Sequence, residues 1–342
     1  MNRFSLVICL VTAVVLGSCA STDHSAALSL GNAGVTATQA LSEQTSSMGQ
    51  TVSELSPWWG VRNALACAAV IAELRSGCLA GATAAPNPAL ADRVSQISAV
   101  ITKRKIALDT LNQAYAAFVD LAKYNGGHEA SAALATSFGK VNSYVTAASA
   151  LVPGGQAAPV ISTTIGDIAD RAVAFAADSK QNRQIIAASK DLRVADDAMF
   201  KGLMLERDAT ASLLVTLQGE RAALDASALA AGLIAPADVL GPIINQAYPG
   251  MKVASPPAAN GDVIMAAAKN ALADQAQTAT ASAPKSYDDA LAVLRDLSAQ
   301  HQKLETKQPL DLTQIDSGIS NLQADMTQMS PASPAPKTAA TQ

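Results

Sequence analysis

The sequence predicts an all-α fold: an elongated, antiparallel helical bundle with long coiled-coil-like hairpins. Alanine is the most frequent residue, and the aromatic residues that favour strands make up only 4% of the chain. Apolar residues recur in alternating steps of four and three along most of the 342 positions, which is the spacing of one helix face. No proline interrupts the stretch between Pro159 and Pro236, so the pattern is compatible with very long helices.

The N-terminal residues carry a targeting pattern. A single basic residue, Arg3, precedes an apolar stretch over 4–16, which is shorter than the roughly 20 residues that a membrane-spanning helix needs. The stretch ends in Leu16-Gly17-Ser18-Cys19, which resembles the lipobox of bacterial lipoprotein precursors. The resemblance implies that residues 1–18 are a lipoprotein signal peptide, and that Cys19 becomes the first mature residue and carries lipid chains such as palmitate. An ordinary secretory signal is the alternative, and the cysteine at this place favours lipidation.

The same resemblance implies a location. In the lipoprotein class, Ala20 rather than an aspartate after the acylated cysteine implies sorting to the outer membrane. Each buried methylene of an acyl chain contributes roughly 0.8 kcal/mol, so two or three chains hold a soluble domain at a bilayer. We therefore expect an envelope protein held by lipid on the periplasmic face of the outer membrane rather than the inner one. Residues 19–28 are expected to be the lipidated cysteine and a loose linker.

Residues 29–234 are predicted to form the long-helix bundle. The first apolar stripe meets Ser56-Pro57, where we expect one helix to end and another to begin, because proline disfavours a helical conformation in the residue before it. Asn87 and Pro88 then form a typical helix start, and the seam that follows has Arg104 as its only break. The apolar positions of these stripes are Leu41, Met48, Val52, Leu55 and Trp59, and then Leu90, Val94, Ile97, Ile101, Leu108, Leu111, Tyr115, Phe118 and Ala122.

Two further helical stretches complete the predicted bundle. One seam runs from Leu134 to Val152 and stops at Pro153. The longest element covers 160–231, and whether it is one helix or two, with a bend in the polar run 178–183, stays open at this point.

Residues 235–261 lack any period and are rich in proline and glycine. This composition predicts an irregular connection, packed through Ile243, Ile244 and Tyr248, and a soft boundary between subdomains.

Residues 262–329 are predicted to be C-terminal helices that pack on the bundle. One of them is expected to start at Ser286, with Asp289 completing a capping box. The remaining residues, 330–342, are rich in proline, alanine and threonine, and are predicted to be disordered.

Two cysteines, Cys67 and Cys78, form the candidate disulfide of the mature chain. In a continuous helix their alpha carbons would lie roughly 16 Å apart, far beyond the limit of about 7 Å for a disulfide. The bond therefore requires the helix to end soon after Ala72 and the chain to fold back. If the helix instead runs unbroken to Gly77, both thiols are buried and unbonded.

Charge and histidine content exclude several classes of function. The net charge is −4 and the basic residues are spread out, whereas nucleic-acid binding needs concentrated positive charge, so no nucleic-acid partner is expected. His24, His128 and His301 are scattered and lack metal-ligand spacing, so we expect no metal and no cofactor. His301 falls on an apolar stripe and is interpreted as a structural residue.

Carboxylate pairs do not suggest an active site either. In Asp196-Asp197 and Asp288-Asp289 the adjacent side chains diverge by about 100 degrees on a helix, so we interpret both pairs as solvated faces. No nucleophile elbow or glycine-rich phosphate loop appears, and the sequence favours a protein that is not an enzyme.

One stretch, 141–166, contains no charged residue and includes the loop between two predicted helices. An exposed apolar tip of this kind typically marks an interaction site, whereas a tip packed on the C-terminal helices would be ordinary core. The candidate interaction residues are Leu151, Val152, Pro153, Pro159, Val160 and Ile161.

Two functions are compatible with these features. We expect a lipid-anchored periplasmic scaffold or adaptor that reaches the membrane through its lipid and acts on an envelope protein partner by contact, without catalysis. The alternative is a membrane-active protein whose uncharged tip contacts a bilayer, which resembles α-helical pore-forming toxins in plan only. The partner and the formation of a homo-oligomer stay open.

Overall fold

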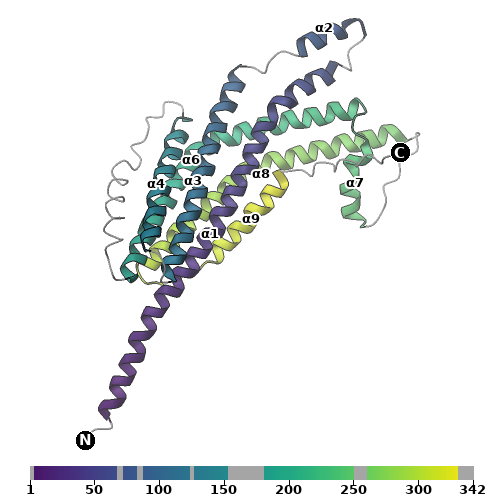
Figure 1. Ribbon diagram of the computed structural model, residues 1–342. Coiled ribbons are helices and arrows are strands. Elements are labelled where there is room, and N and C mark those ends of the chain that lie inside the picture. Colours follow the sequence, from purple (N-terminus) through teal and green to yellow (C-terminus); the bar gives the residue numbers. More distant parts are fainter. Residues whose placement is uncertain are drawn as a thin grey trace, which may run out of the picture. The chain divides into compact units, whose positions relative to one another are not determined.

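The computed structural model describes residues 4–67, 72–82, 88–123, 127–152, 181–249 and 260–329 (Figure 1). The predicted all-α fold is confirmed, because these residues form helices and turns without any β-strand. The helices are α1 (Phe4–Ala66), α2 (Ala72–Ala82), α3 (Pro88–Ala122), α4 (Gly127–Ser149), α6 (Gln181–Ala230), α7 (Pro236–Ala247), α8 (Gly261–Glu305) and α9 (Thr313–Met329).

The chain divides into two compact units. Unit 1 comprises Met1–Ser46, Ala99–Asp208 and Tyr287–Gln323, and unit 2 comprises Ser47–Ser98, Ala209–Ser286 and Ala324–Gln342. Several helices, among them α1, α3, α6 and α8, contribute one stretch to each unit. The predicted boundary near residue 235 therefore does not coincide with the division that the structure shows.

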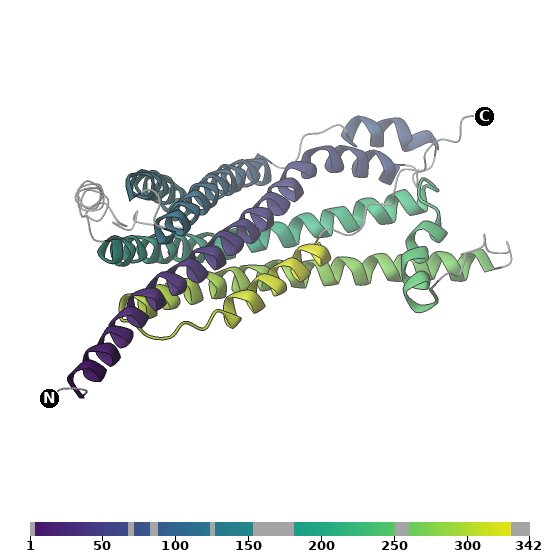
Figure 2. The same ribbon diagram turned by 60° about the horizontal axis from the view of Figure 1, so that its bottom comes forward.

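The helix pairs α1–α3, α3–α6 and α6–α8 of unit 1 run antiparallel, as predicted (Figures 1 and 2). Residue numbers rise along α1 as they fall along α3: the Asn112 amide donates to the Val35 carbonyl at 2.8 Å, and the Ser42 hydroxyl donates to Asp109 at 2.7 Å. The same relation holds between α3 and α6 and between α6 and α8. Helices α3 and α8 instead run parallel, because Arg104 contacts Tyr287 and Tyr115 contacts His301.

Two glycines bring helices of unit 1 into close contact. A Cβ atom added to Gly34 of α1 would lie 2.0 Å from Cδ1 of Tyr115, and one added to Gly202 of α6 would lie 2.4 Å from Cε1 of Tyr144. Both tyrosines are completely buried. The missing side chains therefore make the space that these two large rings fill.

Helix α6 ends in a sequence-encoded cap in unit 2. Gly232 has a φ of +73°, its N–H donates to the Leu229 carbonyl at 3.1 Å, and the Leu233 N–H donates to the Ala228 carbonyl at 2.9 Å. This pattern is the Schellman motif, in which a residue with positive φ satisfies the last carbonyls of a helix. Lys307 ends α8 in the same way, with a φ of 57°.

Three predicted interruptions of helices were wrong. Helix α1 continues through Pro57, and α8 continues through Pro284, so Ser286 is a buried residue inside a helix and not the start of one. The supposed irregular connection 235–261 contains α7, with Pro236 at its start and Pro242 inside it. An internal proline costs a helix about 3 kcal/mol, and packing along a long helix outweighs that cost.

The expected loose linker is also helical. Residues 19–28 lie within α1, Ala27 and Leu30 are completely buried, and Nδ1 of His24 lies 3.2 Å from the Ala122 carbonyl oxygen. Small side chains allow this close approach of α1 to α3, which a prediction based on apolar stripes alone does not detect.

Cys67 and Cys78 lie at bonding distance in unit 2, with their alpha carbons 5.7 Å apart, as the predicted disulfide requires. Helix α1 ends at Ala66, before the end near Ala72 that was expected, and Cys78 lies on α2, which begins at Ala72. Cys67 is buried, whereas Leu74 and Leu79 of α2 are exposed.

Candidate functional site

Unit 1 contains two clusters of buried polar side chains between α3, α6 and α8, and α4 adds one tyrosine to the first of them. We call the first the arginine cluster: Arg104, Tyr144, Glu206 and Tyr287. We call the second the histidine cluster: Tyr115, Ser189, Asp196 and His301. All eight side chains are essentially inaccessible to solvent. Buried polar groups of this kind are stable only when they are paired, so the contacts within each cluster decide what it can do.

The arginine cluster is centred on an ion pair between Arg104 of α3 and Glu206 of α6. Nη1 of Arg104 also donates to the Tyr287 hydroxyl of α8 at 3.0 Å, and that hydroxyl donates to Oε1 of Glu206 at 3.2 Å. The guanidinium carbon lies 5.4 Å from the centre of the Tyr287 ring. Burial alone would lower the pKa of Arg104, but Glu206 and Tyr287 hold it above its ordinary value, so the guanidinium stays charged.

The histidine cluster is a chain of hydrogen bonds. Nδ1 of His301 lies 2.9 Å from the Ser189 hydroxyl, and Nε2 lies 3.0 Å from the Tyr115 hydroxyl. Tyr115 in turn donates to Oδ2 of Asp196 at 2.6 Å. Burial lowers the pKa of His301 to about 3, with a further contribution from Arg193. Burial also raises the pKa of Asp196 well above its ordinary value.

A serine, a histidine and an aspartate in one chain of hydrogen bonds are the residue types of nucleophilic catalysis. Here Tyr115 stands between His301 and Asp196, and the Ser189 side chain is fully enclosed. A nucleophile must touch its substrate, so a group without solvent access is suited to hold helices together. The interpretation of His301 as a structural residue agrees with these contacts.

The interpretation of Asp196 as a solvated residue was wrong. The side chain is completely buried because α6 packs against α3 on one side and α8 on the other. Its neighbour Asp197 is half-buried and accepts a hydrogen bond from Ser298 at 2.7 Å. Asp288 is exposed, as expected, and pairs with Arg207 at 2.6 Å.

A signal in the sequence could have located both clusters. Polar residues occupy seam positions of α6, in the same alternation of four and three as its apolar residues; they are Ser189, Asp196, Glu206 and Thr210. Arg104 is the corresponding break in the seam of α3. Polar residues at seam positions of facing helices predict a buried pair, but only when the breaks in the two seams are considered together.

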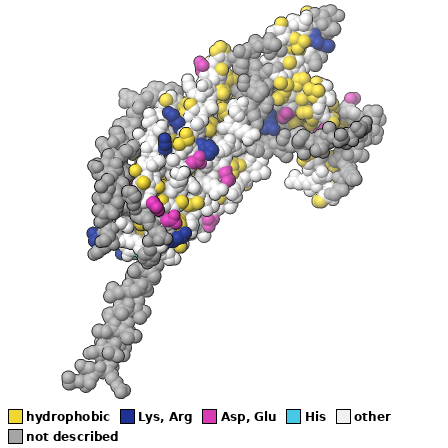
Figure 3. Space-filling model, in the orientation of Figure 1, with side chains coloured by type: hydrophobic (Ala, Val, Ile, Leu, Met, Phe, Trp, Pro, Cys, Tyr) yellow, Lys and Arg dark blue, Asp and Glu magenta, His cyan; other side chains and the backbone are white. Residues whose placement is uncertain are grey.

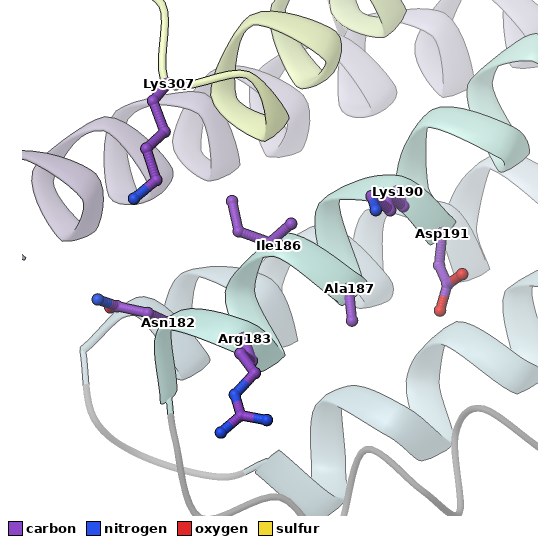
Figure 4. A pocket seen from close by; sticks show the side chains of 7 residues that line it. All are labelled: Asn182, Arg183, Ile186, Ala187, Lys190, Asp191 and Lys307. Carbon is purple, nitrogen blue, oxygen red and sulfur yellow. The ribbon is translucent and has the colours of Figure 1, made fainter.

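An open pocket lies at the first turns of α6, near the end of α8 (Figure 4). Its lining includes three cations, one carboxylate and two apolar side chains; they are Arg183, Lys190, Lys307, Asp191, Ile186 and Ala187. In Figure 4, Lys307 extends toward α6, whereas Arg183 points to the other side of that helix. The cations therefore do not converge on one ligand position.

The remaining predicted site residues are only partly described. Cys19 lies within α1. Leu151 and Val152 are half-buried in the turn after α4, where the Leu151 N–H donates to the Ala148 carbonyl at 3.1 Å. Pro153, Pro159, Val160 and Ile161 lie outside the described residues, as do 330–342, so the interaction tip and the tail stay predictions. Residues 160–180 of the predicted element 160–231 also lie outside them, and α6 covers most of the rest.

Metal-ligand groups and membrane spans are not found in the described part of the chain. Within the described ranges, no group of three or more His, Cys, Asp or Glu residues is placed to hold a metal ion. In the same ranges, no helix combines the length and the apolar character needed to cross a membrane. On the face drawn in Figure 3, charged side chains of both signs are scattered among uncharged ones.

Unit 2 exposes large apolar side chains around α7. Helices α6, α7 and α8 share a small core there, formed by Leu229, Val239, Ala268 and Ala271. Beside this core, Ile243 and Tyr248 are 43% and 60% exposed, and Leu233 and Val263 are 68% and 71% exposed. We call these four exposed residues the α7 surface. The expectation that Ile243 and Tyr248 pack inside a connection was therefore wrong, whereas Ile244 is half-buried.

Comparison of the chain with protein-family models, with curated proteins and with solved structures gives no match.

Proposed function

We propose that this chain is a lipid-anchored scaffold or adaptor of the bacterial envelope, which acts by protein contact. The observation that carries the proposal is the tetrapeptide Leu16-Gly17-Ser18-Cys19 at the end of a short apolar stretch. A lipid on Cys19 would fix the helical units to a membrane surface without any membrane-spanning segment.

The surface chemistry supports the contact function. The exposed residues of the α7 surface are large and apolar, which is typical of the centre of a protein interface. The buried clusters do not reach solvent, and their polar atoms bond to one another across α3, α6 and α8, so they are suited to hold the helices together. We propose that the partner is an envelope protein that presents an apolar face to α7.

The test is photo-crosslinking in intact cells of the source bacterium, with a photoreactive residue in place of Tyr248. We expect one discrete adduct, which is lost in Cys19→Ser and kept in Cys9→Ser. Cys9 lies in the predicted signal peptide, so its replacement is the matched control for the loss of a thiol. A probe at Met204, which is 56% exposed on unit 1, is the control for a general apolar surface.

Three outcomes would overturn the proposal. The first is the absence of an adduct both from the probe at Tyr248 and from a second probe placed at Ile243. The second is the same set of adducts from the probe at Met204. The third is an adduct from Tyr248 that persists in Cys19→Ser.

A further inference from the structure

The histidine cluster places two titratable groups in one enclosed chain of hydrogen bonds. Nε2 of His301 lies 3.9 Å from Oδ2 of Asp196, and the Tyr115 hydroxyl is within hydrogen-bond distance of both atoms. Oδ1 of Asp196 has no hydrogen-bond partner among the described residues. An isolated charge on either group would therefore be poorly compensated.

Two proton arrangements satisfy the same hydrogen bonds. In the first, Ser189 donates to Nδ1 of a neutral His301, Nε2–H donates to Tyr115, and Tyr115 donates to a protonated Asp196. In the second, an imidazolium donates to both Ser189 and Tyr115, Ser189 turns its hydroxyl to the His301 carbonyl at 3.5 Å, and Tyr115 donates to an ionised Asp196. The two arrangements hold the same number of protons, and each is neutral overall.

The surrounding charges favour the first arrangement, in which neither His301 nor Asp196 carries a charge. On α6, Arg193 lowers the pKa of His301 after the larger effect of burial. Also on α6, Asp197 raises the pKa of Asp196 after burial, against the opposing hydrogen bond from Tyr115.

The other helices around the cluster hold these charges in place. Helix α8 supplies Glu305, which pairs with Arg193 at 2.8 Å, and Ser298, which donates to Asp197. Helix α3 contributes Tyr115, and α1 faces its ring through Gly34.

We propose that Asp196 and His301 act as one unit with a single shared proton, which makes the contribution of this cluster to the stability of unit 1 independent of pH in the mildly acidic range. The unfolded chain also binds one proton there, on the free histidine, while the free aspartate is ionised. With ordinary pKa values of about 3.9 and about 6.5, this window runs from about pH 4 to about pH 6.5. Equal numbers of bound protons in the two states mean no slope of stability with pH.

The sign of each separate contribution follows from the direction of its shift. The raised pKa of Asp196 favours the folded state in acid and loses that effect as the pH rises. The lowered pKa of His301 favours the folded state at neutral pH and loses that effect as the pH falls. Between about pH 4 and about pH 6.5, the two contributions change the unfolding free energy with pH in opposite directions and cancel.

Removing either group alone should therefore make the stability of unit 1 depend on pH, and the two variants should show this dependence with opposite signs. In Asp196→Asn, the opening equilibrium of unit 1 should rise by up to about tenfold for each pH unit of acidification between pH 6 and 4.5. In His301→Gln it should fall by up to about the same factor. The double variant should return to the slope of the unsubstituted chain. Native-state hydrogen exchange at α8 amides of the full chain, corrected for intrinsic rates, measures this equilibrium.

The control is Gly139→Ala, which changes an exposed residue of unit 1 without a titratable side chain and should keep the slope of the unsubstituted chain. Slopes of the same sign in the two single variants would overturn the proposal. A second measurement needs no substitution: the NMR titration of the His301 ring in the full chain should show no separate step between pH 4.5 and 6. An ordinary histidine titration near pH 6.5 would equally overturn it.

Discussion

Replacing Arg104 by methionine is expected to destabilise unit 1 by about 3 to 5 kcal/mol, because the change breaks a buried ion pair and leaves one partner behind. The side chain is 1% exposed, and its partner Glu206 is completely inaccessible. Without the guanidinium, Glu206 would be an unpaired charge in the core or would have to bind a proton, and Tyr287 would lose a donor. Denaturant unfolding of the full chain, combined with hydrogen exchange at unit 1 amides, measures the loss.

The double variant Arg104→Met with Glu206→Leu separates an unpaired charge from lost packing. Replacement of both members of a buried pair by apolar residues is often neutral, so the double variant should recover most of the lost stability. Lys103→Met is the matched control: the side chain is exposed, and the change should stay within about 0.5 kcal/mol. An Arg104→Met variant as stable as the control, or a double variant no better than the single one, would contradict this role.

Replacing Gly34 by alanine is expected to destabilise unit 1 by about 1 to 3 kcal/mol, the usual cost of overpacking a core. The new Cβ would lie 2.0 Å from Cδ1 of Tyr115, so the ring has to move. The hydroxyl of that ring is held by Asp196 and His301, so the movement also strains the histidine cluster. Thermal or denaturant unfolding of the full chain measures the effect.

Replacing Gly139 by alanine is the matched control, and this change should alter the stability in the opposite direction. Gly139 lies on the exposed face of α4, and a Cβ there would meet nothing within 4 Å. Alanine inside a helix is favoured over glycine by up to about 1 kcal/mol, so Gly139→Ala should stabilise the chain. A Gly34→Ala variant that is as stable as Gly139→Ala would show that α1 does not pack on Tyr115 as described.

Much of the helical architecture could be predicted from the sequence. The seam that starts at Pro88 and ends at Ala122 corresponds to α3, because its cap and its period agree with each other. Helix geometry also showed that a bond between Cys67 and Cys78 requires the helix to end between them, and the two cysteines lie on different helical segments at bonding distance. Local signals were sufficient in these places because they and the tertiary packing favour the same structure.

Other features could not be predicted because packing overrides local preference. Pro57 and Pro284 are strong local signals for a helix end, yet both lie inside long helices. The burial of Asp196 depends on two other helices, so its position on α6 alone does not reveal it. The contact between Gly34 and Tyr115 was equally hidden, because a glycine adds nothing to a hydrophobic pattern.

In the candidate site, too, the sequence singled out unusual residues but not the contacts that they make. The sequence marked Arg104 as a break in a seam, but its partners Glu206 and Tyr287 lie far along the chain. The exposure of Ile243 and Tyr248 depends on the short helix α7, which the prolines of that segment concealed. Prediction from one sequence therefore located unusual residues more readily than the contacts that explain them.

The most direct test of the proposed function is the chemical state of the mature N-terminus. Metabolic labelling with palmitate, followed by mass spectrometry of the N-terminal peptide, should give a labelled protein that begins at an acylated Cys19. The label should disappear in Cys19→Ser and persist in Cys9→Ser. An unlabelled protein, or a mature chain that begins at any other residue, would contradict the lipid anchor and with it the proposed role as an envelope scaffold.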